Sequence, residues 1–340
     1  MQKRTLGNTE ITVAPLMLGG NVFGWSADQA TSFRILDAFV DRGYGFVDTA
    51  DVYSKWAPGN QGGESETVIG KWFKERGTRD KVVLATKVGN DMGDGKKGLK
   101  AKYIFEAVED SLRRLQTDYI DLYQVHATDL VTPVEETVRA LNTLVEMGKV
   151  RYIGISNWHA WRIMKALGIQ EQKNLAKFDT LQAYYSIAGR DLEREIVPLL
   201  EDQKMGLLVW SPLAGGLLSG KFTRENQKPE DSRRSNFDFP IVDKERTWNV
   251  LDVMRPIAEA HKASVATVAL AYVLAKPFVS SVIIGAKKMS QLQDNLAAVD
   301  LKLSEEEMKK LDEVSALPPE YPGWMIPFQN MNRLADVPRF

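Results

Sequence analysis

Short apolar segments and longer amphipathic segments alternate along most of the chain. Each apolar segment has five to eight residues, the length of a strand that is buried in a sheet. Several of them turn polar near their ends, as "GFVDT" does at Asp48. The segments with this pattern are residues 14–19, 45–49, 82–87, 119–126, 152–156, 180–186, 206–212 and 279–285.

The segments between these strands have apolar residues at the spacing of an amphipathic helix. Residues 29–43, 65–77 and 134–149 show this spacing most clearly. Short apolar strands that alternate with helices predict a parallel sheet covered by helices, and a count of eight favours closure into a barrel. We therefore predict an α/β fold, a (β/α)8 TIM barrel that forms one domain over residues 1–340.

Three parts of the chain fall outside the repeat. "KRTL", "GNTE" and "ITVA" at residues 3–14 predict a β-hairpin that caps the barrel. The stretch between Leu213 and Ser280 is too long for one loop, so we expect an inserted loop and an extra helix there. The tail at about 315–340 is rich in proline and aromatic residues, and we expect it over or near the barrel mouth of its own or a neighbouring subunit.

Composition narrows the classes of partner. The chain has 44 Lys and Arg against 45 Asp and Glu, without the basic excess that nucleic acid or an anionic membrane surface requires. It has no cysteine, which excludes disulfides, thiolate metal sites and a cysteine nucleophile. No apolar run is long enough to span a membrane, and the N-terminus lacks the apolar region of a signal peptide. We expect a cytoplasmic protein with a small-molecule partner; composition leaves monomer and homo-oligomer open.

Polar residues gather where the predicted strands end. In a barrel of this class, the active site lies at the C-terminal ends of the strands. Taken singly, Asp48 could serve a turn, Lys87 could be a solvated charge and His126 a core histidine. Their occurrence at the same end of consecutive strands favours a shared site. The residues at these ends are Gly19, Gly20, Asp48, Tyr53, Lys87, His126, Ser156, Asn157, Gln182, Tyr184, Trp210, Ser211, Gly285 and Lys287.

These side chains suit the reduction of a carbonyl group. A tyrosine hydroxyl has a pKa of about 10, and a lysine beside it stabilises the phenolate. Asp48 would keep Lys87 charged, and Tyr53 would deliver the proton. A neutral His126 would orient the carbonyl oxygen. With no cysteine or metal cluster as electron source, a nicotinamide cofactor is the natural supplier of hydride. Asp51, between Asp48 and Tyr53, is interpreted as a turn residue.

The chain resembles the aldo-keto reductases from its N-terminal hairpin to about residue 300. "GFVDTADVYSKWAPGNQGGESETVIGKW" is similar to the family segment with the catalytic Asp and Tyr, and "DYIDLYQVH" to the segment that ends in the catalytic His. "GKVRYIGISN" is similar to the segment that contacts nicotinamide. The resemblance implies that Asp48, Tyr53, Lys87 and His126 form the family's catalytic tetrad.

The resemblance also implies where the cofactor binds. Ser156, Asn157 and Gln182 match the residues that bind the carboxamide, and Tyr184 or Trp210 would stack on the ring. "WSPLAGGLLSGK" and "IIGAKKMSQLQDN" are similar to the pyrophosphate and adenosine segments. The implied contacts in these two segments are Ser211, Pro212, Leu213, Gly215, Lys221, Gly285, Lys287, Gln291, Asp294 and Asn295.

The choice between NADP(H) and NAD(H) depends on two lysines. Lys287 and Lys288 favour a 2′-phosphate and hence NADP(H), with NAD(H) the less favoured cofactor. The family often has arginine at the position of Lys287, and lysine lacks the bidentate fork of arginine, which weakens this preference. Solvated lysines at a helix start are the ordinary alternative.

Other motifs are rejected or left open. Residues 215–222 nearly match a phosphate-binding loop, but Phe222 stands where serine or threonine is required. The three histidines have no metal-ligand spacing, so no metal site is predicted. Trp25, Trp56 and Trp158 fall in loops on the catalytic side and could line a substrate pocket or simply pack against the barrel.

Three functions remain after this comparison. The leading one is an NADP(H)-dependent reductase of an aldehyde or ketone, which can also run as an alcohol dehydrogenase. The resemblance extends to the β subunits of potassium channels, so a cofactor-binding partner subunit is the second. A Schiff-base aldolase that uses Lys87 is the third, but it gives the cofactor segments no role.

Overall fold

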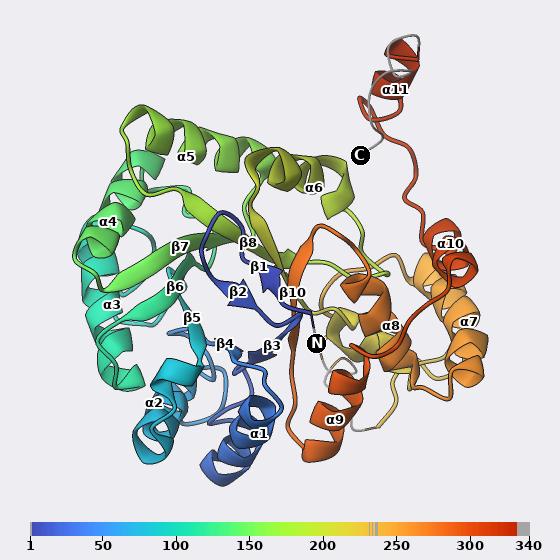
Figure 1. The fold of residues 1–340 in the computed structure, drawn as a ribbon, viewed down its shortest axis with the longest axis horizontal. Coiled ribbons are helices and arrows are strands. Elements are labelled where there is room, and N and C mark those ends of the chain that lie inside the picture. Colours follow the sequence, from blue (N-terminus) through green and yellow to red (C-terminus); the bar gives the residue numbers. More distant parts are fainter. Residues whose placement is uncertain (1, 231, 233, 235–236, 332–340) are drawn as a thin grey trace.

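The computed structural model describes residues 2–230, 232, 234 and 237–331 (Figure 1). Parallel strands close into a barrel in the order β10-β3-β4-β5-β6-β7-β8-β9. This arrangement confirms the predicted (β/α)8 barrel. The strands are β3 (Leu16–Gly19), β4 (Phe46–Asp48), β5 (Val83–Val88), β6 (Ile120–Val125), β7 (Val150–Ser156), β8 (Phe178–Tyr184), β9 (Gly206–Trp210) and β10 (Val279–Ile284).

Helices surround the barrel because each one buries an apolar stripe against the strands. In α3, for example, Ile104, Val108, Leu112 and Leu115 recur at helical spacing, and all four are buried. Figure 1 shows the ring of helices around the strands. Its members are α1 (Gln29–Asp41), α2 (Glu64–Arg76), α3 (Ala101–Leu115), α4 (Val134–Glu146), α5 (Ala160–Gln172), α6 (Leu192–Gln203), α8 (Val265–Leu274) and α9 (Met289–Ala297).

The N-terminal hairpin closes one end of the barrel. β1 (Arg4–Thr5) pairs antiparallel with β2 (Thr12–Val13), and the hairpin lies across the ring of strands in Figure 1. Leu6 and Val13 of this hairpin are buried in one apolar cluster with Phe46 and Leu122, which lie near the starts of their strands. The predicted hairpin cap is therefore confirmed. The open end of the barrel is the opposite one, at the C-terminal ends of the strands, and is called the mouth below.

The stretch after β9 contains the predicted loop and extra helix. It begins with the short helix η2 (Ala214–Ser219) and continues through a long loop to α7 (Lys244–Ala260). Buried Arg234 fastens the loop, because its guanidinium donates to the carbonyl oxygens of Ala214 (2.6 Å) and Pro240 (2.9 Å). No single helix in the described part of the chain is long and apolar enough to cross a membrane. Only α7 and α8 taken together reach the length and apolar composition of a membrane span, and the two helices are bent by 100° relative to each other.

The C-terminal segment leaves the barrel beside α6. After α10 (Glu305–Val314), Arg194 of α6 donates to the carbonyl oxygen of Pro318 and pairs with Glu320 at 3.1 Å. Figure 1 shows the short helix α11 (Met325–Gln329) standing apart from the ring of strands. Residues 332–340 lie outside the described residues, so the position of the whole tail near a barrel mouth stays a prediction.

Candidate active site

Neighbouring strands bring the four predicted catalytic residues together at the mouth. Asp48 is the last residue of β4, Lys87 lies near the end of β5, and His126 directly follows β6. The turn after β4 brings Tyr53 back over them. The hydroxyl of Tyr53 donates to Asp48 Oδ2 (3.1 Å) and accepts from Lys87 Nζ (2.9 Å).

Lys87 is the centre of this cluster. Its side chain is fully buried, and its ammonium group also donates to Asp48 Oδ2 (2.8 Å) and to the backbone oxygen of Thr49 (2.8 Å). Its three N–H groups therefore have three acceptors. Asp48 is buried as well, and its second oxygen accepts from Gln182 Nε2 (2.9 Å). Both charges of the pair are thus fixed by hydrogen bonds away from solvent.

The environment of Tyr53 keeps its proton in place. Burial raises the pKa of Tyr53 well above 10, and the negative charge of Asp48 acts in the same direction. The sequence argument expected the lysine to ease the loss of this proton, but burial and Asp48 outweigh it in the folded protein. The phenol is consequently a proton donor at neutral pH, one that a strong base such as a forming alkoxide can deprotonate.

His126 completes the cluster as a neutral ring. Burial lowers the pKa of His126 well below 6.5, and the charge of Lys87 lowers it further. The ring lies 5.8 Å from the Tyr53 ring between centroids, at an angle of 72°. A neutral imidazole has one N–H to donate, so His126 and Tyr53 can hold the same acceptor oxygen.

Aromatic side chains form a rim beside this cluster. Trp56 lies 6.0 Å from the Tyr53 ring and 5.8 Å from the Trp25 ring between centroids. Trp25 and Trp56 are partly exposed (38% and 49%), as a pocket wall would be. Trp158 does not join them: it is buried and packs against Phe178 (6.0 Å between centroids) and under the guanidinium of Arg162. The structure thus gives Trp158 the packing position that the sequence left as an alternative.

The residues expected at the nicotinamide lie next to the tetrad. Asn157 has a left-handed backbone (φ 61°), which turns its side chain back toward the strand ends. Its amide nitrogen donates to Ser156 Oγ (2.9 Å) and its amide oxygen accepts from Trp210 Nε1 (3.0 Å). Tyr184 and Trp210 lie 5.3 Å apart between ring centroids. Polar groups and an aromatic surface therefore occur side by side next to the tetrad.

The segment expected at the pyrophosphate is a tight turn. Ser211 Oγ accepts from the backbone N–H of Gly215 (2.9 Å), while Pro212 is buried, Leu213 half-buried and Lys221 exposed. Gly215 has φ 66°, and a Cβ atom there would lie 2.0 Å from the backbone oxygen of Phe239. Only glycine fits this position, because the inserted loop closes directly over it.

The segment expected at the adenosine surrounds the start of α9. Asn295 donates to the backbone oxygen of Gly285 (3.1 Å), and Gln291 accepts from the backbone N–H of Lys287 (2.9 Å). Asp294 instead accepts from Ser264 and Thr267 at the start of α8. Lys287 is half-buried and Lys288 exposed before the first turn of α9. A helix start with nearby cations is an anion-binding arrangement.

Sequence reasoning missed one residue of the site, Phe239 of the inserted loop, which stacks on Trp210 at 5.7 Å between centroids, with planes 9° apart. It placed Gln182 in the site but did not predict the bond from Gln182 to Asp48. The position of Phe239 could not be read from the sequence because it depends on the path of a long loop.

Taken together, the residues of these three segments fit a nicotinamide dinucleotide. Aromatic faces and amide groups lie beside the tetrad, a glycine turn follows, and lysines lie at the start of α9. No group of three His, Cys, Asp or Glu in the described residues is arranged to hold a metal ion.

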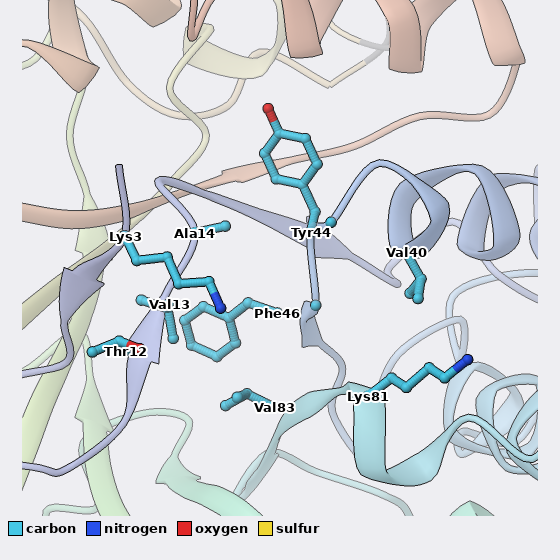
Figure 2. Close-up of a pocket in the computed structure, with 11 residues that line it drawn as sticks. Lys3, Thr12, Val13, Ala14, Val40, Tyr44, Phe46, Lys81 and Val83 are labelled. Atoms are coloured by element: carbon cyan, nitrogen blue, oxygen red, sulfur yellow. The ribbon is translucent and has the colours of Figure 1, made fainter. Parts of the chain in front are cut away.

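A separate cavity lies at the other end of the barrel. It has a volume of about 270 Å³ and is lined by Lys3 and Thr12 of the hairpin region and by Phe46 and Val83, which begin their strands (Figure 2). The tetrad residues lie near or just beyond the opposite ends of the strands, so this cavity is not part of the candidate active site.

Fold and site together define a barrel with a buried tyrosine, lysine and aspartate cluster at its mouth. The chain belongs to the Aldo/keto reductase family, whose model matches residues 15–316.

Relatives cover nearly the whole chain. "Uncharacterized oxidoreductase YrpG" of Bacillus subtilis is 39% identical over 95% of this chain and 100% of its own length. "Norsolorinic acid reductase A" of Aspergillus parasiticus is 37% identical over 96% of this chain and 82% of its own. A "Probable voltage-gated potassium channel subunit beta" of Arabidopsis thaliana is 35% identical over 88% of this chain and 92% of its own. Family and relatives together support an oxidoreductase.

Proposed function

We propose that this protein is an NADP(H)-dependent reductase of aldehydes or ketones that can also oxidise the corresponding alcohols. The observation that carries the proposal is the Tyr53 hydroxyl, which is bonded to both Lys87 and Asp48 and lies beside the neutral ring of His126. Tyr53 is the proton donor, and Asp48 and Lys87 hold it in place.

The chain's own residues would act on the carbonyl oxygen. The single O–H of Tyr53 turns from Asp48 Oδ2 to this oxygen, and His126 and Tyr53 together donate hydrogen bonds to it and orient the carbonyl group at the mouth. Reduced nicotinamide, when bound, supplies hydride to the carbonyl carbon. As negative charge develops on the oxygen, the proton moves from Tyr53 to the forming alkoxide, while the ammonium group of Lys87 stabilises the phenolate left behind. Trp25 and Trp56 shield this step from water on one side.

We assign the cofactor contacts from the arrangement of polar and aromatic residues beside the tetrad. Ser156, Asn157 and Gln182 would hold the carboxamide, Tyr184 or Trp210 the ring, and the turn from Ser211 to Gly215 the pyrophosphate. The partly buried position of Lys287 before α9 supports a 2′-phosphate there, and so NADP(H) over NAD(H).

A cofactor-binding partner subunit is the second candidate function. The extensive similarity to a protein named as a potassium channel β subunit favours it. The complete tetrad is compatible with either function. A Schiff-base enzyme is less well supported, because the ammonium group of Lys87 already has three acceptors and carries a charge paired with Asp48.

The test is a fluorescence titration of the purified protein with NADPH and with NADH, followed by a panel of aldehydes and ketones monitored at the nicotinamide absorbance. Tighter binding of NADPH and turnover of at least one carbonyl compound are the expected results. Tight binding with no turnover across the panel would favour the partner subunit, and no binding of either cofactor would contradict both functions.

A further inference from the structure

Asp51 is a buried carboxyl group that the proposed reaction does not use. It lies in the turn between Asp48 and Tyr53, and its backbone N–H donates to the backbone oxygen of Lys87 (3.2 Å). Its side chain is only 1% exposed, and neither carboxyl oxygen has a hydrogen-bond partner among the described residues. The nearby backbone N–H of Val52 acts on the carboxyl group but does not reach the geometry of a hydrogen bond.

Each cation near Asp51 is already paired with another acid. Arg114 Nε donates to Glu66 (2.7 Å), and Glu66 is itself fully buried. Lys87 is paired with Asp48 at 2.7 Å. Besides Asp48 and Tyr53 of its own segment, the charged and titratable groups that face Asp51 are Lys87 of β5, Glu66 of α2, Arg114 and Tyr103 of α3, and Tyr123 of β6.

A negative charge is strongly disfavoured in these surroundings. A buried carboxylate without hydrogen bonds has lost the solvation that stabilises its charge, and a neutral acid loses far less. Burial raises the pKa of Asp51 to about 8, and the charge of Glu66 raises it too, while Arg114 and Lys87 oppose them. Asp51 is therefore mainly protonated at neutral pH.

We propose that Asp51 is a positioning residue whose proton, held at neutral pH, keeps Tyr53 acidic enough to donate its own proton to the substrate. The inference rests on the proposed carbonyl reduction. A negative charge on Asp51 would raise the pKa of both Tyr53 and Lys87. While Asp51 is neutral, Asp48 is the main negative charge that acts on Tyr53. Loss of the Asp51 proton in alkaline solution makes Tyr53 a weaker acid and slows reduction.

The first experiment compares pH profiles of kcat for carbonyl reduction at saturating NADPH. The wild type is expected to slow as the pH rises through about 8, because each unit added to the pKa of Tyr53 slows proton donation by up to about tenfold. Asp51→Asn keeps the shape of a neutral acid but cannot ionise, so its profile should lose this alkaline fall.

Asp179→Asn is the matched control for the profile. Burial raises the pKa of Asp179 to about 7, but Asp179 lies at the start of β8, near the hairpin end of the barrel. This variant should keep the alkaline fall of the wild type. The same fall in Asp51→Asn as in the wild type would overturn the link between Asp51 and Tyr53.

The second experiment needs no turnover. The infrared spectrum of the resting wild type minus that of Asp51→Asn should contain the C=O stretch of a protonated carboxyl group, which disappears as the pH rises through about 8. Should the variant fold poorly, Asp179→Asn labelled with ¹³C-aspartate is titrated instead, because it lacks the other carboxyl group with a raised pKa, and it should show the same isotope-shifted band. Absence of the band at neutral pH would overturn the inference. A wild type with the band but without carbonyl reduction would contradict the proposed function and still support the proton on Asp51.

Discussion

The proton on Asp51 also predicts how the stability of the fold depends on pH. The carboxyl group has a pKa of about 8 in the folded protein, against an ordinary value of 3.8. The folded state therefore binds a proton that the unfolded chain releases above about pH 4. Since the folded pKa is the higher one, this contribution to stability is complete below about pH 4 and is lost as the pH rises toward 8.

The side chain in Asp51→Asn cannot ionise. The difference in unfolding free energy between this variant and the wild type therefore measures how much the titration of Asp51 contributes to stability. One pKa unit corresponds to about 1.4 kcal/mol, so the unfolding free energy of the variant relative to the wild type should rise by about 1.4 kcal/mol per pH unit in this window. From pH 5 to pH 7 the relative gain is roughly 3 kcal/mol, as an order of magnitude.

Urea denaturation at pH 5, 6 and 7 measures this difference. Asp51→Ala is the matched control: it removes the same charge and should show the same slope, offset by a constant loss from the packing that the smaller side chain gives up. A difference between Asp51→Asn and wild type that stays flat from pH 5 to 7 would refute the reasoning, because it would mean that Asp51 ionises alike in the folded and unfolded states.

Two further predictions concern lysines with different roles. Lys87→Met leaves Asp48 buried without its cation and should lower the unfolding free energy by about 3–5 kcal/mol in urea denaturation. The control Lys102→Met, at an exposed pair with Glu106, should change it by less than about 1 kcal/mol. Equal effects of the two replacements would contradict the role of the buried Lys87–Asp48 pair in stability. In a fluorescence titration, Lys287→Ala should weaken binding of NADPH by roughly tenfold, about 1.4 kcal/mol, and binding of NADH much less. The control Lys309→Ala on α10 should affect neither. An equal loss of affinity for both cofactors would contradict a contact between Lys287 and the 2′-phosphate.

The sequence predicted the fold well because burial on both faces of a strand leaves a clear pattern. All the predicted strands are present, and each strand end lies within two residues of its predicted position. The hairpin and the insertion occur where they were expected. The start of the extra helix was not predicted: α7 begins at Lys244 because Asp243 caps it by accepting from the backbone N–H of Arg246 (3.0 Å). A helix cap is a local hydrogen bond, and the spacing of apolar residues does not reveal it.

The site was predicted less completely, because its electrostatics depend on packing. Asp48, Tyr53 and Lys87 could be placed together from their positions at strand ends. The pKa of Tyr53 is raised mainly by burial, and a sequence motif does not show how deeply a side chain is buried. For the same reason the interpretation of Asp51 as a turn residue was incomplete: the residue does lie in a turn, but only the packing of α2, α3 and β6 shows that its carboxyl group is enclosed.

The most direct test of the proposed function compares wild type with Tyr53→Phe at saturating NADPH. Oxidation of NADPH is followed at the nicotinamide absorbance with an aldehyde that the wild type reduces, and binding of NADPH is measured in parallel by fluorescence. The proposed function predicts that the variant binds NADPH as the wild type does and loses most of its turnover, because phenylalanine has no proton to donate. Turnover equal to that of the wild type would contradict the role of Tyr53 and with it the proposed reaction.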